Sequence, residues 1–258
     1  MRRMLLTTIF IAATALPAPA QLSPRDRWAD SARTQIEAAY TVGDIDRVRG
    51  ARALVERALT AFPDDPLLQH YYAYALHREA NLLMGRQRAK EEQYRPLLEQ
   101  ADSLLERSAA KLPLAETHAL RSSVLGQLIN NPLRGMILGP RSSSAMDRAL
   151  ELGPRNPRVW LLRGIGAMFT PAMFGGGADK AEEYLRKAIT LFADDRPAPP
   201  LPAWGHAEAY VWLGQTLHKQ KRIDDARAAY AKALELQPEN GWVRQVLLPA
   251  LDRTGKSQ

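Results

Sequence analysis

Small and large apolar side chains recur along this chain in a helical pattern that ends in proline. The clearest copy has a small residue, a large apolar residue four positions on, another small residue three further on and a proline after five more. The first three share one face of a helix, and proline ends that helix because it has no backbone N–H to donate. The pattern predicts five helices, at Ala51, Val55, Ala58 and Pro63; Ala101, Leu105, Ser108 and Pro113; Ser142, Met146, Ala149 and Pro154; Ala181, Leu185, Ala188 and, in place of proline, Ala193; and Ala226, Tyr230, Ala233 and Pro238.

The last of these helices belongs to a longer motif. Residues 207–240 resemble one complete tetratricopeptide (TPR) repeat, a helix-turn-helix unit of 34 residues. The residues at the family's consensus positions are Tyr210, Leu213, Gly214, Leu217, Ala226, Tyr230, Ala233 and Pro238. The resemblance implies that Gly214 and Ala226 let the two helices cross closely. One such unit cannot bury its apolar face alone, so further repeats are expected.

We therefore predict an all-α fold, an α-solenoid of about five TPR-like helix pairs with insertions. It is expected to span residues 21–258 as a single domain, with a short capping helix at 241–248 that ends or kinks at Pro249. Residues 156–188 also look similar to a group of exported bacterial TPR proteins, which supports export and implies no activity.

The repeats are spaced more widely than 34 residues, so they carry insertions. The charged segment 86–96 predicts lengthened helices, and Asn130 to Pro140 predicts a loop between the third pair of helices. The proline-rich segment 196–203 is expected to form a stiff, extended connector. The glycines at 175–177 predict a tight turn with positive φ within a loop at 170–177, because no phosphate-loop motif surrounds them. Ser142 to Ser144 are expected to cap the third of the five helices.

Residues 1–20 have the layout of a secretory signal peptide. Arg2 and Arg3 precede an apolar run at 4–16, and Ala18 and Ala20 satisfy the small-residue rule for cleavage. We expect cleavage between Ala20 and Gln21 and a periplasmic or secreted mature protein. An uncleaved membrane anchor is the rival interpretation, but a bilayer span needs about 20 apolar residues.

The composition of the chain mainly excludes certain kinds of partner and site. The formal net charge is +7, but basic and acidic residues are mixed along the chain, which argues against a nucleic-acid partner. The absence of cysteine excludes disulfides, thiolate metal sites and a cysteine nucleophile. His70 and His77 share a helix face without a third metal ligand, so we expect groove lining there. We predict no catalytic residues, no cofactor and no metal.

A TPR array binds partners on the concave face that its first helices line. The resemblance assigns that role to His70, Tyr74, His77 and Arg78 in the second repeat, Arg158, Leu161, Ile165 and Phe169 in the fourth, and Gln215, His218 and Lys219 in the fifth. The middle of this face is apolar. It would therefore bind an apolar segment, be covered by an insertion or be closed by tight curvature. If it is open, Tyr74→Ala with Arg78→Ala should abolish partner capture and leave stability unchanged.

These observations favour an exported, non-enzymatic scaffold that binds a protein or peptide segment in its concave groove. The alternative is an enzyme or small-ligand receptor that uses a cavity formed by the insertions, with the loop at 170–177 at its rim. A cavity in which at least two titratable groups converge would favour that alternative. A glycan-binding envelope factor has less support, because few aromatic residues stand at predictable surface positions.

Overall fold

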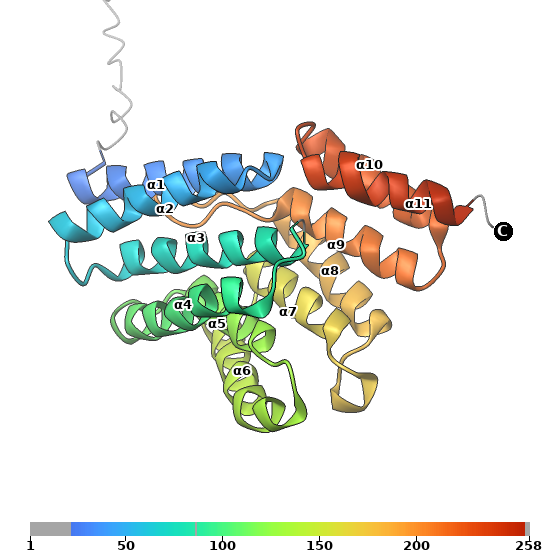
Figure 1. Ribbon diagram of the computed structural model, residues 1–258, viewed down its shortest axis with the longest axis horizontal. Helices are drawn as coiled ribbons and strands as arrows, with labels where there is room; N and C mark the ends of the chain where they lie inside the picture. Colours follow the sequence, from blue (N-terminus) through green and yellow to red (C-terminus); the bar gives the residue numbers. More distant parts are fainter. Residues whose placement is uncertain (1–21, 86, 256–258) are drawn as a thin grey trace, which may run out of the picture.

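Helices stacked in antiparallel pairs make up most of the described chain (Figure 1). The computed structural model describes residues 22–85 and 87–255, and this part holds eleven α-helices and no strand. The pairs are α1 (Pro24–Val42) with α2 (Ile45–Ala61), α3 (Pro66–Gly85) with α4 (Glu91–Lys111), α5 (Ala115–Gln127) with α6 (Pro132–Leu152), α7 (Pro157–Phe169) with α8 (Ala178–Phe192), and α9 (His206–Lys219) with α10 (Ile223–Leu236). The all-α solenoid of five helix pairs is confirmed.

The second helix of every pair coincides with the small-large-small pattern. In α10, Ala226, Tyr230 and Ala233 are buried, and equivalent positions of α2, α4 and α8 are buried as well. Four of these helices end two residues before the proline that the pattern contains, at Pro63, Pro113, Pro154 and Pro238. Ser108 shows why a small polar residue fits such a crossing, because its Oγ donates to the Pro66 carbonyl 2.7 Å away.

The lengthened second repeat is confirmed, but the third repeat differs from its prediction. Its helix α6 starts at Pro132, so the expected loop is shorter and Pro140 lies inside the helix. Asn131 caps α6 by accepting from the Arg134 N–H, which leaves no capping role for Ser142. The Ser142 Oγ instead donates to the Ser122 carbonyl, 2.9 Å away. The first half of α6 is largely exposed, so water can satisfy the backbone groups that Pro140 leaves unpaired.

The C-terminal helix also runs further than predicted. A π-helical turn, η2 (Val243–Leu247), leads directly into α11 (Leu248–Gly255), so Pro249 lies near the start of α11 instead of ending the helix. A π turn widens the helix locally and relieves the clash between proline and the preceding turn.

The two predicted irregular segments are present. The loop between α7 and α8 contains a short 3-10 turn, η1 (Ala172–Phe174), and the positive φ values of Gly175 (83°) and Gly177 (101°) confirm the tight glycine turn. The proline-rich connector lies between α8 and α9 and has no regular secondary structure. Within the described ranges, no helix is both long and apolar enough to cross a bilayer. The predicted signal peptide lies outside the described residues.

Candidate functional site

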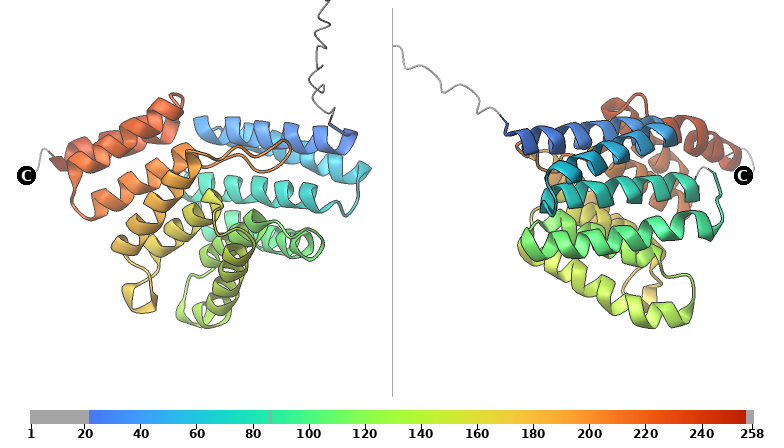
Figure 2. Two further views of the ribbon diagram at one scale, coloured as in Figure 1. Left: turned by 180° about the vertical axis from the view of Figure 1, so that it is seen from behind. Right: turned by 60° about the vertical axis from the view of Figure 1, so that its left-hand side comes forward.

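The connector between α8 and α9 covers much of the predicted groove. It leaves the C-terminal repeats, runs alongside α1 and α3, and returns to start α9 (Figure 2). The Tyr71 hydroxyl donates to the Pro200 carbonyl at 2.5 Å, and the Trp204 ring stacks on the Tyr74 ring with centroids 5.1 Å apart. Gly205 ends the connector with φ 106°, and a Cβ there would lie 2.7 Å from the Leu161 side chain. The chain's own proline-rich segment therefore lies where a peptide ligand was expected.

Arg78 joins three parts of the molecule beneath this connector. Its guanidinium donates to both carboxylate oxygens of Glu208 on α9, at 2.8 and 2.6 Å, and to the Tyr74 hydroxyl at 2.7 Å. Tyr74 donates in turn to Glu37 on α1. Burial raises the pKa of the Glu37 carboxyl, although Arg78 and the Tyr74 hydroxyl act in the opposite direction. This network links α1, α3 and α9, and it leaves Arg78 only 2% exposed.

Arg158 forms a second buried pair at the other end of the connector. Its guanidinium binds both carboxylate oxygens of Asp195, at 3.2 and 2.6 Å, and lies over the Phe192 ring. Asp195 directly precedes the proline-rich segment, so this pair fixes the connector's first residues to α7. The side chain of Arg158 is as deeply buried as that of Arg78, and it holds part of the chain in place of a partner.

The two histidines of α3 are also internal. His70 Nδ1 lies 3.0 Å from Thr117 Oγ1, and His77 Nε2 lies 3.2 Å from Gln127 Nε2 on α5. Burial lowers the pKa of both imidazoles to about 3, so both are neutral at pH 7. They contribute to packing between α3 and α5. In the described part of the chain, no group of three or more potential metal ligands gathers.

Burial thus changes the predicted partner-binding set. Six of its members are buried and packed against the chain itself, which removes them from any open groove: His70, Tyr74, His77, Arg78, Arg158 and Leu161. The other five keep exposed surface, and they lie toward the C-terminal end of the array: Ile165, Phe169, Gln215, His218 and Lys219. The expectation that an insertion covers the apolar middle holds for Leu161, while Phe169 is 68% exposed.

The open part of the face carries a row of aromatic rings. Phe169 at the end of α7 meets the edge of Trp212 on α9 at 5.9 Å, and Trp212 meets Trp242 at 5.6 Å, next to η2. We call these three residues the aromatic row. Lys219 lies beside it and donates from Nζ to the Met168 carbonyl at 3.2 Å. Sequence reasoning missed both tryptophans, although Trp212 is seven residues before Lys219 and therefore shares its helix face.

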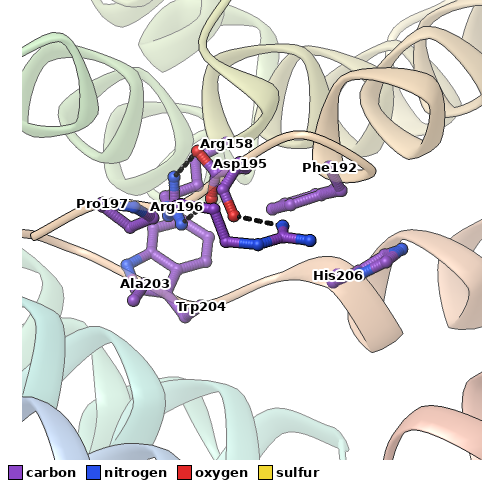
Figure 3. A pocket seen from close by; sticks show the side chains of 8 residues that line it. All are labelled: Arg158, Phe192, Asp195, Arg196, Pro197, Ala203, Trp204 and His206. Atoms are coloured by element: carbon purple, nitrogen blue, oxygen red, sulfur yellow. Dashed lines mark hydrogen bonds and ion pairs between the residues drawn. The ribbon is translucent and has the colours of Figure 1, made fainter. Parts of the chain in front are cut away.

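A small hollow is the other candidate site. Figure 3 shows Arg158 and Asp195 at its wall, with Phe192 and His206 on one side and Trp204 on the other. Arg196, Pro197 and Ala203 complete the lining, so its rim is the connector and not the loop at 170–177. Titratable groups do converge here, but Arg158 and Asp195 already pair with each other. The volume of about 160 Å³ is below the roughly 300 Å³ at which small-ligand sites begin.

The comparison with protein families identifies the repeat. A tetratricopeptide repeat model matches residues 207–240. The chain contains a TPR repeat. The stretch matched is α9, α10 and the turn between them, and the same helix pairing extends this TPR architecture to the preceding pairs. A search of curated proteins finds no match.

Solved structures agree on the fold. TTC0263, a thermophilic TPR protein of Thermus thermophilus, is 24% identical with a TM-score of 0.61, over 88% of this chain and 98% of that one. The HusA haemophore from Porphyromonas gingivalis is also 24% identical, with a TM-score of 0.51 over 77% of this chain and 96% of that one. Identities this low show a shared TPR-like solenoid and no more.

Proposed function

We propose that this chain is an exported, non-enzymatic scaffold that binds a protein or peptide segment on its aromatic row. The observation that carries the proposal is the contact of a 68% exposed Phe169 with the half-buried Trp212, which in turn meets the half-buried Trp242, beside the part of the predicted groove that the connector leaves uncovered. The TPR-like solenoid is a fold typical of protein–protein interaction, because its stacked repeats present an extended concave surface.

The row suits an apolar side chain with a negative neighbour. Aromatic rings offer large contact areas at low entropic cost, and aromatic residues often dominate binding energy by about 2 kcal/mol or more when truncated. Lys219 is exposed beside the row and can pair with a carboxylate. An extended or helical segment with one buried apolar anchor and a nearby acidic residue fits this surface best. The small hollow, in which Arg158 and Asp195 already pair with each other, favours no second function.

Site-specific photocrosslinking tests the proposal. A benzoylphenylalanine at position 169 should give adducts with a discrete partner in cells, and the same group at Glu235, exposed on α10, should give none. Phe169→Ala should weaken binding about tenfold or more while the melting temperature stays unchanged, because the ring contributes little to the core. Adducts of equal yield from both positions, or full binding by a folded Phe169→Ala variant, would remove the row as the site.

A further inference from the structure

A second apolar surface lies away from the aromatic row. It is made of Leu133, Met136 and Ile137 on α6 and of Met173 and Phe174 in η1, with exposures of 67%, 77%, 59%, 83% and 72%. The first half of α6 and the α7–α8 loop project at the same end of the molecule, at the bottom in Figure 1 and again in both views of Figure 2. We call these five residues the apolar tips.

The α6 part of this surface faces away from the protein. Leu133, Met136 and Ile137 are spaced three and four residues apart and share one helix face. Ala145 and Ala149, the buried residues of α6, lie on the opposite face, against α5. The helix packs closely on α5 and only slightly on α7. The stripe is therefore not part of the solenoid core, although second helices elsewhere in the array pack on the next pair.

The charge on the α6 part of the tips is positive. Residues 131–141 contain Arg134 and Arg141 and no aspartate or glutamate, while the loop at 169–178 carries no charge and is followed by Asp179 and Lys180 at the start of α8. Arg141 pairs with Asp102 at 3.0 Å, whereas Arg134 makes no ion pair among the described residues. Relative to the apolar stripe, both arginines lie on the same flank of α6, which is the arrangement of helices that lie in a membrane interface.

We infer that the apolar tips contact a bilayer surface that carries anionic lipids. Two features favour lipid over a folded partner. The side chains are among the most exposed of the molecule and stand on protruding segments, whereas a protein partner usually fills a groove or pocket. A fluid acyl boundary accepts such protrusions without a complementary shape, and arginine beside them attracts lipid phosphates. Exposed apolar clusters that serve no contact are rare on soluble proteins.

Vesicle co-sedimentation of residues 21–258, which contain the whole described fold, tests the inference. The protein should sediment with vesicles of phosphatidylglycerol and phosphatidylethanolamine and stay in the supernatant with phosphatidylcholine alone. Met173→Asp with Phe174→Asp should lower the bound fraction about tenfold or more, since it places two carboxylates at the anionic interface. Leu236→Asp with Val246→Asp, equally apolar positions outside the tips, is the matched control and should bind like the wild type.

Three results would overturn the inference. In the first, the wild type sediments with neither kind of vesicle. In the second, both double variants lose the same share of the bound fraction. In the third, the wild type binds no lipid and is a dimer, and only the Met173/Phe174 variant is a monomer. Light scattering reports the last of these, and circular dichroism shows that each variant is folded. Because Phe169 is unchanged in this series, failure here leaves the proposed peptide site untouched.

Discussion

Arg78 shows how burial changes the role of a single residue. From its repeat position it was assigned to partner binding, yet it lies between the rings of Tyr40 and Tyr74 and pairs with Glu208 from an element 130 residues away. A buried guanidinium is tolerated when its charge is compensated, and both terminal nitrogens of Arg78 donate hydrogen bonds here. The Tyr74→Ala and Arg78→Ala double variant is therefore expected to destabilise the fold, which replaces the expectation of unchanged stability.

Removing either side of this pair should be costly. Arg78→Ala leaves the Glu208 carboxylate uncompensated, and we expect a loss of about 3–5 kcal/mol in the free energy of unfolding. The control is Arg47→Ala, whose partner Asp44 and own side chain are both exposed, and it should cost less than about 1 kcal/mol. Urea denaturation of both variants checks this. Similar midpoints would show that the Arg78 network does not stabilise the solenoid.

The buried histidines should make stability depend on pH. In the unfolded chain each imidazole protonates near its ordinary pKa of 6.5, whereas in the folded chain burial lowers the pKa to about 3. The unfolded state thus binds more protons between these values. Stability is complete above pH 6.5 and falls as the pH drops toward 3, by about 1.4 kcal/mol per pH unit for each histidine.

Replacing both histidines isolates this effect. His70→Asn with His77→Gln should flatten the dependence of the unfolding free energy on pH in that window. Glu37 has a raised pKa and acts with the opposite sign, but it is present in both proteins and cancels in the comparison. An unchanged slope in urea titrations at several pH values would contradict the assignment of His70 and His77 as buried, neutral groups.

At the scale of elements, the crossing of α9 and α10 sets how the clearest repeat packs. A Cβ at Gly214 would lie 2.4 Å from the Tyr230 ring, so the two helices approach too closely for any other residue. This is the close crossing that the TPR resemblance implied for Gly214. Gly50 in α2 also lies in a helix, but nothing lies within 4 Å of a Cβ built there.

The two glycines should respond to alanine in opposite directions. Gly214→Ala forces the Tyr230 ring to move and should destabilise by about 1–3 kcal/mol. Gly50→Ala adds helix propensity without a clash and should stabilise by about 0.4–1 kcal/mol. The melting temperatures of both variants, compared with that of the wild type, check this prediction. A stabilising Gly214→Ala would mean that the α9–α10 crossing is wider than this structure shows.

At the scale of the whole molecule, the connector decides which surface a partner can reach. It closes the inner face between α1, α3 and α9 and leaves the C-terminal part open, where Phe169 lies. Because Phe169 is 68% exposed there, Phe169→Ala is expected to reduce binding without loss of stability. The apolar tips add a separate surface on the third and fourth helix pairs, at the bottom of Figure 1.

Processing of the N-terminus is the remaining prediction at this scale. Ala18 and Ala20 precede Gln21, so the exported protein should begin at Gln21. N-terminal sequencing of protein recovered from the periplasm or the medium checks this. If the protein is instead found in the membrane fraction with Met1 as its N-terminal residue, the uncleaved anchor is favoured over cleavage and release.

The sequence by itself determined the elements and their pairing. A helix, its close crossing with the preceding helix and its end depend on residues that are near one another in the sequence, such as Ala226, Tyr230, Ala233 and Pro238. A pattern of residue types is therefore enough to predict them. Predictions failed where one residue was compatible with two local structures. Pro140 was assigned to a loop because proline usually breaks helices, but an exposed first half lets α6 include it.

Only the tertiary structure decided which face stays open. The connector meets Tyr71 through Pro200, 129 residues away along the chain, and such a contact leaves no periodic trace in the sequence. His70, Arg78 and Arg158 have the residue types of a binding groove, and a polar side chain looks the same in sequence whether it meets a partner or its own chain. Burial depends on contacts between distant segments, so the position of the aromatic row and of the apolar tips had to come from the fold.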